Sequence, residues 1–324
     1  MSELHRFLFE GLPVRGVLVK LTQEWREVLC SREGSQSSFE PPVRDLLGEM
    51  AAAATLLQAN IKFDGSLILQ IFGDGWVKVA VAEVQPDLAF RVTATVTPTS
   101  IQKQKCPGDF KSLVDEKGQG RCVITLDPQS KLPGQQPYQG VVPLNTGPGQ
   151  TFSQLSEVLE HYMWQSEQLE TRFILAADEN VAAGLLIQRL PTEGAGNLGL
   201  QSLGEADEDE NEAFDRISHL VASLKRDELL TLDAGTLLRR LFWGETLRLF
   251  EPSYPRFACS CTLGRVTQMI QGLGLREAQE ILAEQGQIEV SCEFCGQQYR
   301  FDAVDISSLF VPQAFSGISS QAVN

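Results

Sequence analysis

The sequence predicts an α+β protein with a core domain of mixed sheet and helix, a helical metastable linker and a small cysteine-rich C-terminal domain. Three observations predict this class. A helix-forming segment is followed by runs that alternate with period two, helices and strands follow in irregular order, and four of seven cysteines lie near the C-terminus. A chain of 324 residues, 43% of them hydrophobic, is long enough for about two domains. We place the core at 1–203, the linker at 204–256, the C-terminal domain at 257–312 and a flexible tail at 313–324.

The core begins with mixed signals and then shows a clear helix. Residues 43–60 are rich in Ala, Leu, Met and Glu, and the preceding prolines are tolerated in a first helical turn. Alternation then takes over, and Gly73-Asp74-Gly75 between two alternating runs predicts an antiparallel hairpin. A second helix is predicted over 152–168. Strand signals occupy 61–63, 67–71, 77–81, 91–96, 122–126, 140–144, 173–177 and 183–190.

The linker starts where periodicity is lost. Residues 191–204 are glycine-rich and an acidic run follows, which indicates a domain boundary. Leucine-rich stretches at helical spacing then extend over 214–242. Such short amphipathic helices are marginal alone and need a surface to pack against. Their apolar stripe is ordinarily part of a core, and it becomes available only if something unpacks it.

Composition disfavours several classes of partner. The 27 Lys and Arg against 42 Asp and Glu give a net charge of −15, which repels nucleic acid and anionic lipid surfaces. The N-terminal residues mix charges among apolar side chains, so we expect no signal peptide. The longest apolar stretch, 50–57, is far shorter than the ~20 residues that cross a bilayer. We therefore expect a cytoplasmic protein that binds neither nucleic acid nor membranes.

The strongest motif combines Cys259-Ser260-Cys261 with Cys292-Glu293-Phe294-Cys295-Gly296. Two close cysteine pairs can supply the four tetrahedral ligands that a structural zinc ion needs. No histidine lies in this segment, so we expect the ligands to be all sulfur. Alternating residues on both sides of the second pair place it in a turn between two strands, where the glycine permits the bend.

Three other interpretations of the cysteines fit the sequence less well. Four buried free thiols in two tight pairs would be a coincidence. A thioredoxin-like redox pair opens a helix after a strand, whereas Cys295 is followed by glycine and a strand pattern. A zinc ribbon that binds nucleic acid should be basic, yet residues 252–324 contain four arginines, no lysine and seven acids.

Other motifs carry no chemistry, and we expect no catalytic residue. Residues 194–199 match G-x-G-x-x-G, but an acidic run follows instead of a phosphate-binding helix, so a flexible linker is the better interpretation. Cys122 shares a strand face with apolar residues and is expected to be buried. The remaining candidates lack an interpretable setting or resemble ordinary surface residues: His5, His161, His219, Cys30 and Cys106.

Zinc and the linker together suggest a switch. Zinc binding contributes roughly 10–16 kcal/mol to the folding of small modules, so its loss would unfold the C-terminal domain. Oxidants attack thiolates, and each cysteine pair holds a partner that can form a disulfide. The linker helices beside the domain would then lose support and expose their apolar faces. Exposed apolar surface next to strong negative charge permits a chaperone, without demanding one.

The chain resembles the redox-regulated heat-shock chaperones of bacteria, the thirty-three-kilodalton holdases. The resemblance covers nearly the whole length, and the cysteine spacing is its most specific element. The other matching segments are Leu4–Glu10, Val14–Gly16, Lys62–Gly65, Gly73–Gly75, Tyr138–Val142 and Ser166–Leu169. The glycine-rich approach to the linker and the three additional cysteines depart from the family pattern.

The resemblance implies an ATP-independent holdase that is inactive when reduced and zinc-bound, and that is activated for unfolded client proteins by oxidative unfolding. It implies zinc ligation by Cys259, Cys261, Cys292 and Cys295, and disulfides Cys259–Cys261 and Cys292–Cys295 after oxidation. It also implies a monomer when reduced and a homodimer when oxidised. Two other functions remain open: a thiol-disulfide oxidoreductase that uses Cys292 and Cys295, and a zinc-dependent adaptor with one specific partner.

Overall fold

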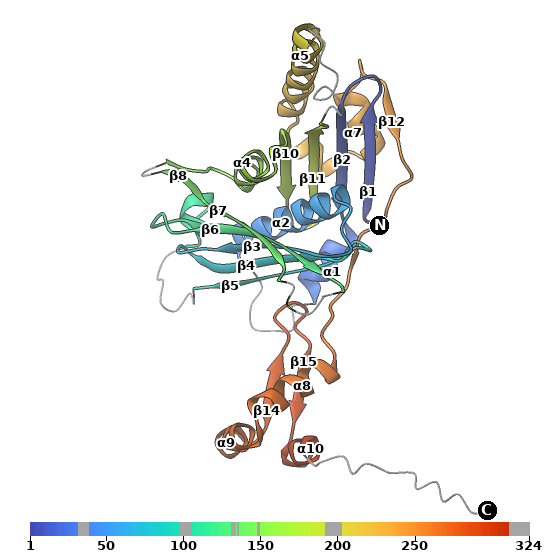
Figure 1. Cartoon of the computed structure of the whole chain (residues 1–324). Helices are drawn as coiled ribbons and strands as arrows, with labels where there is room; N and C mark the ends of the chain where they lie inside the picture. The colour runs from blue at the N-terminus through green and yellow to red at the C-terminus, as the bar shows by residue number, and fades with distance from the viewer. Residues whose placement is uncertain are drawn as a thin grey trace, which may run out of the picture. The chain divides into compact units, whose positions relative to one another are not determined.

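The structure, a computed structural model, divides into two compact units, Met1–Cys259 and Ser260–Asn324 (Figure 1). The described residues are 1–31, 39–97, 105–130, 134, 136–147, 150–191 and 203–310, of which 150 and 203–211 are described by their backbone alone. The G-x-G-x-x-G match at 194–199 and the predicted tail at 313–324 therefore lie outside the described residues.

The first unit contains two large sheets, which confirms the α+β class (Figure 1). The five-stranded sheet has the order β10-β11-β2-β1-β12. Its strands are β1 (Glu3–Phe9), β2 (Val14–Leu21), β10 (Thr171–Ala177), β11 (Ala182–Arg189) and β12 (Leu247–Leu249). The six-stranded sheet has the order β13-β5-β4-β3-β6-β7. Its strands are β3 (Gly65–Phe72), β4 (Val77–Val84), β5 (Ala89–Val96), β6 (Arg121–Pro128), β7 (Tyr138–Pro143) and β13 (Arg256–Phe257).

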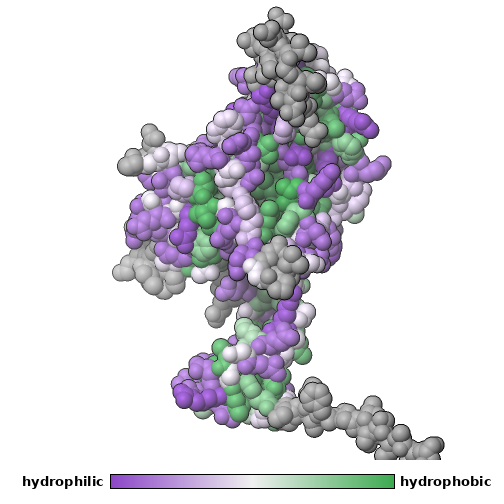
Figure 2. Space-filling view, in the orientation of Figure 1, coloured by the Kyte–Doolittle hydropathy of each residue, from purple (hydrophilic) through white to green (hydrophobic). Residues whose placement is uncertain are grey.

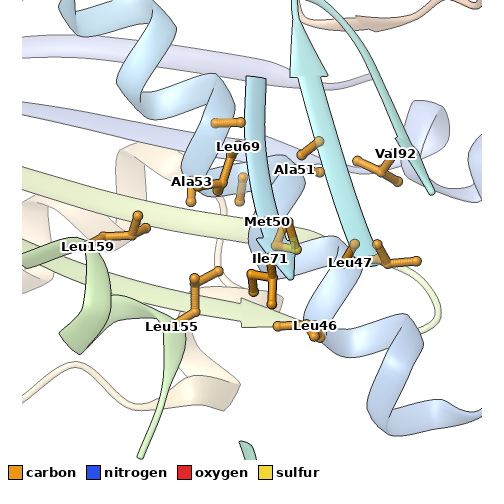
Figure 3. Packing of buried hydrophobic residues seen from close by; sticks show 14 of the residues in the cluster. Leu46, Leu47, Met50, Ala51, Ala53, Leu69, Ile71, Val92, Leu155 and Leu159 are labelled. Atoms are coloured by element: carbon orange, nitrogen blue, oxygen red, sulfur yellow. The ribbon is translucent and has the colours of Figure 1, made fainter. Parts of the chain in front are cut away.

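Helix α2 (Pro41–Asn60) packs against strands of both sheets and forms the centre of the main core (Figure 3). A proline in its first turn agrees with the predicted start. Four consecutive alanines, 51–54, are fully buried, so the helix is apolar around most of its circumference, as a helix covered on several sides must be. Figure 3 shows its side chains beside Leu69 and Ile71 of β3 and Leu155 and Leu159 of α4 (Leu155–Glu167).

The β3–β4 hairpin forms where it was predicted, whereas helix α4 begins later than predicted. The hairpin around Gly73-Asp74-Gly75 is confirmed, since β3 and β4 pair antiparallel. The helix predicted from residue 152 begins at Leu155 instead. The Phe152 amide donates to the Leu144 carbonyl, which holds this residue outside the helix. The remaining short elements of this unit are α1 (Gln23–Cys30), α3 (Phe110–Val114), β8 (Asn145–Gly147) and β9 (Gln150–Thr151).

Three helices of the predicted linker pack against the five-stranded sheet. They are α5 (Leu203–Ala222), α6 (Arg226–Thr231) and α7 (Ala234–Leu241). Their leucine-rich faces and the sheet form a second core, separate from that around α2. This linker-covered core contains Phe7, Phe9, Val14, Leu18, Ala176, Ala183, Leu185 and Ile187 from the sheet and Phe214, Ile217, Val221, Leu229, Leu230, Ala234, Leu237, Leu238, Leu241 and Phe242 from the linker.

After α7 the chain returns along the first unit through residues 247–259, called here the return segment. It begins as β12 beside β1, forms a bridge between Ser253 and Leu4, and pairs through β13 with β5. The Ala258 amide then donates to the Phe90 carbonyl at 3.1 Å. The linker is thus joined to the sheets by main-chain hydrogen bonds up to the residue before Cys259.

The second unit has a small core of its own. The elements of this unit are α8 (Leu263–Leu273), α9 (Leu275–Gln285), β14 (Ile288–Ser291), β15 (Gln298–Phe301) and α10 (Ala303–Leu309). Among residues 260–310, the buried apolar side chains are Val266, Ile270, Ala278, Ile288, Phe301 and Ile306. Figure 2 shows apolar residues beside a polar area on its visible face. The two strands were predicted, whereas the three helices were not.

Candidate metal centre

The Cys292–Cys295 pair lies in a tight turn between β14 and β15, as predicted. The Cys292 amide donates to the Gln297 carbonyl at 2.9 Å, and the Gly296 amide donates to the Cys292 carbonyl at 2.8 Å. Gly296 has φ of 69°, a conformation that costs glycine little because it has no Cβ. The C-x-x-C-G sequence therefore closes the turn that presents both thiols.

The other pair connects two regular elements. Cys259 follows β13 and the Ala258 hydrogen bond, and Cys261 precedes α8. Thr262 caps α8 by accepting a hydrogen bond from the Arg265 amide at 3.2 Å. The C-x-C spacing thus lies between the end of the return segment and the capped start of a helix.

The four sulfurs of Cys259, Cys261, Cys292 and Cys295 all lie within 4.8 Å of one another. The Cys261 and Cys295 sulfurs are 3.3 Å apart. Zinc–sulfur bonds of about 2.3 Å require sulfurs about 3.8 Å apart at the corners of a tetrahedron. None of the seven cysteines is part of a disulfide, so the four thiols are available as ligands. The spacing and chemistry of this donor set fit a metal ion with four sulfur ligands.

Two polar side chains approach these sulfurs, and sequence reasoning did not assign either of them a role. The Tyr299 hydroxyl donates to the Cys261 sulfur at 3.4 Å. This hydrogen bond, with burial and the charge of three cysteines, raises the pKa of Tyr299 to about 12, so the phenol remains a donor at neutral pH. The Arg91 guanidinium interacts with the Cys259 sulfur. Neither contact could be found from sequence spacing, because the partners are far apart in the chain.

The other sequence candidates lie away from this cluster. Cys122 is buried, as predicted, and burial raises its pKa to about 12. Cys106 is also buried, and burial with the Glu40 charge raises its pKa to about 11. Cys30 is exposed at the end of α1. Both buried thiols are thus protonated at neutral pH and are poor nucleophiles.

The histidines also lack a shared site. His161 is half-buried on α4 and packs against the Phe152 ring at a centroid distance of 5.3 Å. His5 pairs with Glu3, and the His219 ring lies 2.7 Å from the Asp215 carbonyl within α5. These are local structural contacts.

Among the described residues, no helix has both the length and the apolar composition needed to cross a bilayer.

Comparison with known proteins identifies the family. The family model described as "Hsp33 protein" matches residues 2–302, which include both sheets, the linker and all four clustered cysteines. The chain belongs to the Hsp33 family. A curated relative from Chromobacterium violaceum, named "33 kDa chaperonin", is 42% identical over 314 residues, which cover 95% of this chain and 94% of the relative. Its counterpart of the same name from Neisseria meningitidis serogroup A is 38% identical over 306 residues, covering 94% and 90%.

A solved Hsp33 structure has the same fold. The 33 kDa chaperonin of Thermotoga maritima superposes with a TM-score of 0.72, covering 95% of this chain and 97% of that one. The sequence identity is 20%, so this match supports the fold alone. The names of the curated Hsp33 relatives describe chaperonins, which agrees with the expected non-enzymatic role.

Proposed function

We propose that the protein is an ATP-independent holdase that is silent while reduced and zinc-bound, and that binds unfolded proteins after oxidation. The observation that carries the proposal is the convergence of four sulfurs at the end of the return segment. That segment joins the linker to the sheets, and the linker covers a large apolar face. A change at the cysteines can therefore reach the surface that would bind clients.

The metal is proposed to be zinc, held by Cys259, Cys261, Cys292 and Cys295. Thiolates are soft ligands that favour zinc, and four of them leave no open position for catalysis. When bound, zinc contributes folding free energy on the order of 10 kcal/mol to a module of this kind. The described part of the second unit, residues 260–310, has six buried apolar residues, a core so small that the unit depends on this contribution.

Oxidation would remove the ligands in pairs. Two thiolates each give up one electron to a peroxide, one S–S bond forms, the peroxide O–O bond breaks, and two protons from solvent complete two water molecules. Two such reactions yield disulfides Cys259–Cys261 and Cys292–Cys295, the pairing that the family resemblance implies. Disulfide sulfurs are poor metal ligands, so the four cysteines would no longer hold a divalent ion.

Loss of the site would free the end of the return segment, and the linker would lose an anchor. The face that the linker covers includes Phe7 and Phe9 of β1 and Leu185 and Ile187 of β11. Such a contiguous apolar face binds unfolded chains through their own apolar side chains. The net charge of −15 would keep the resulting complexes in solution.

The geometry supports this function over a thiol-disulfide oxidoreductase. In such enzymes the attacking cysteine sits at a helix N-terminus, which lowers its pKa. Here Cys292 and Cys295 lie in a turn between two strands, and their sulfurs are grouped with those of Cys259 and Cys261. A grouping of four thiols serves a metal better than it serves disulfide exchange.

The proposal extends to location and assembly. Four reduced thiols that hold zinc require a reducing compartment, so we place the protein in the cytoplasm. Following the family resemblance, we assign a monomer to the reduced form and a homodimer to the oxidised form. Unfolded polypeptides are the proposed partners, with no role for nucleic acid or membranes.

One experiment tests the proposal. Zinc content and suppression of client aggregation are measured on the same full-length sample before and after hydrogen peroxide treatment under mild heat. We expect about one zinc per chain and no suppression beforehand, then zinc loss and suppression afterwards. Thiol-protected protein without stoichiometric zinc, or oxidised protein that leaves aggregation unchanged, contradicts the proposal. Robust reduction of insulin that is lost in Cys292→Ser would indicate the oxidoreductase instead.

A further inference from the structure

Arg91 is a largely buried arginine on a strand of the six-stranded sheet, with 18% of its side chain exposed. It lies opposite Glu83 in the β4–β5 register. Its Nε and one terminal nitrogen donate to the same Glu83 carboxylate oxygen, at 3.0 and 2.6 Å. The ion pair therefore fixes the guanidinium in one orientation.

The same guanidinium lies next to the end of the return segment. Strand β13 pairs in parallel with the start of β5, and the Ala258 amide donates to Phe90, the residue before Arg91. This register brings Cys259 beside Arg91, and the guanidinium forms a hydrogen bond with the cysteine sulfur. An arginine guanidinium is protonated throughout the pH range in which proteins are folded. Arg91 thus stays charged.

We propose that Arg91 is a positioning residue of the metal site, whose positive charge stabilises the metal-bound Cys259 thiolate and which Glu83 partly neutralises. The proposal rests on the function proposed above. It adds that the affinity of the sulfur cluster for metal is set in part by two charged residues of the six-stranded sheet. Loss of Arg91 should then release metal more readily, and loss of the Glu83 charge should retain it more firmly.

The direction of the expected change in metal affinity follows from the charge of the site before and after metal binding. Metal binding requires the cysteine ligands to lose their protons. Four thiolates around a divalent ion carry a net charge of about −2, so metal loading makes the site more negative. A fixed cation at hydrogen-bond distance favours that state. Removal of such an outer-shell partner typically costs about 10- to 100-fold in metal affinity.

The test uses the full-length reduced chain and four variants. Arg91→Met removes the charge and keeps the apolar stem, Arg91→Lys keeps a charge, and Glu83→Gln keeps an acceptor without its charge. Arg172→Met is the control, because Arg172 forms an ion pair with Glu160 that is not among the contacts of the sulfur cluster. Zinc affinity is measured at pH 7 by competition with a chromophoric chelator. The sulfur-to-metal charge-transfer band is recorded with cobalt(II) in place of zinc.

We expect Arg91→Met to lower zinc affinity at least tenfold and to shift the cobalt band. Arg91→Lys should recover most of the loss, Glu83→Gln should raise the affinity about threefold, and Arg172→Met should change neither measurement. Opposite signs for Arg91→Met and Glu83→Gln are the signature of charge, since a merely structural role would weaken both. Equal affinities, or a loss in both variants, would overturn the proposal.

These outcomes are separate from a failure of the proposed function. Wild-type protein that holds no zinc, or is not activated by oxidant, refutes the redox switch itself. Wild-type protein that is zinc-bound and oxidant-activated, with unchanged affinity in Arg91→Met, refutes only the role of Arg91. A peroxide titration of zinc release adds a second measurement, in which Arg91→Met should release its metal at a lower dose.

Discussion

The ammonium nitrogen of Lys20 lies 3.2 Å from the carbonyl oxygen of Leu230 and also donates to the carbonyl of Leu232. Lys20 belongs to β2, and the two carbonyls belong to the C-terminal end of α6. The last carbonyls of a helix have no partner within the helix and carry partial negative charge. A buried cation of the five-stranded sheet therefore stabilises the end of a linker helix.

Lys20→Met should loosen the linker in the reduced protein. The substitution leaves buried carbonyl groups without a donor, at a cost of about 1–3 kcal/mol. We expect faster proteolysis within residues 204–256 with zinc still bound. Lys78→Met, which removes an exposed lysine bonded to the Asp74 carbonyl, is the control. Equal digestion of both variants would show that Lys20 does not hold the linker.

Phe242→Ala should activate the protein partially without oxidant. Phe242 is 2% exposed, and its ring lies 4.9 Å from that of Phe9 and 5.9 Å from that of Phe7. Truncation of a buried phenylalanine costs about 3–5 kcal/mol of stability. Here the loss would weaken the packing of the linker against the five-stranded sheet. The variant should suppress client aggregation while reduced. The neighbouring Trp243, 85% exposed, provides the control Trp243→Ala, which should remain silent. A reduced Phe242→Ala protein as silent as this control contradicts the prediction.

Glu49 should make the free energy of unfolding depend on pH. Burial raises its pKa to about 7, opposed by the charge of Arg226 and aided by that of Asp45. The native state then binds a proton that the unfolded state has already lost, so stability falls as pH rises from about 4.5 to 7 and levels off above. The loss is on the order of 3 kcal/mol.

Glu49→Gln removes this titration. The free energy of unfolding is measured with urea at pH 5, 6, 7 and 8, with zinc and reductant present. As pH rises, the variant should become more stable relative to wild type. Glu179→Gln, at an exposed carboxylate, should keep the wild-type profile. Parallel profiles for wild type and Glu49→Gln would exclude Glu49 as the source.

Cys295→Ser should weaken zinc binding and relax the linker without any oxidant. A serine hydroxyl is a poor substitute for a thiolate ligand, and three sulfurs hold zinc less firmly than four. Zinc content after dialysis and proteolysis of residues 204–256 are the measurements. Cys30→Ser changes an exposed cysteine outside the cluster and should match wild type. Unchanged protease resistance in zinc-depleted Cys295→Ser would disprove coupling between the site and the linker.

The sequence predicted elements whose signals are local. Alternation and Gly73-Asp74-Gly75 identified the β3–β4 hairpin, and composition identified α2. The C-x-x-C-G motif predicted a strand, a turn and a strand, since both the glycine and the alternation lie within a few residues. The prediction that the two cysteine pairs come together was based on the ligand requirement of zinc and not on any prediction of the fold.

What was missed depends on partners distant in the chain. Arg91 and Lys20 look like ordinary charged strand residues until the return segment and α6 are placed beside them. Helix α8 depends on a threonine cap that has no acidic partner in its first turn, so its start is not marked by a capping box. The start of α4 shifted because a main-chain bond to Leu144 competes with helix formation.

Strand β12 completes the five-stranded sheet by pairing with β1 at Phe7, Leu8 and Phe9. If the linker detaches, this strand leaves too, and β1 becomes an open sheet edge. Its main-chain amides and carbonyls can then pair with any extended polypeptide, whatever its side chains. The detached state would combine an exposed apolar surface with unpaired main-chain hydrogen-bonding groups along β1. Neither feature depends on the sequence of the bound chain, so both suit clients that have only their unfolded state in common.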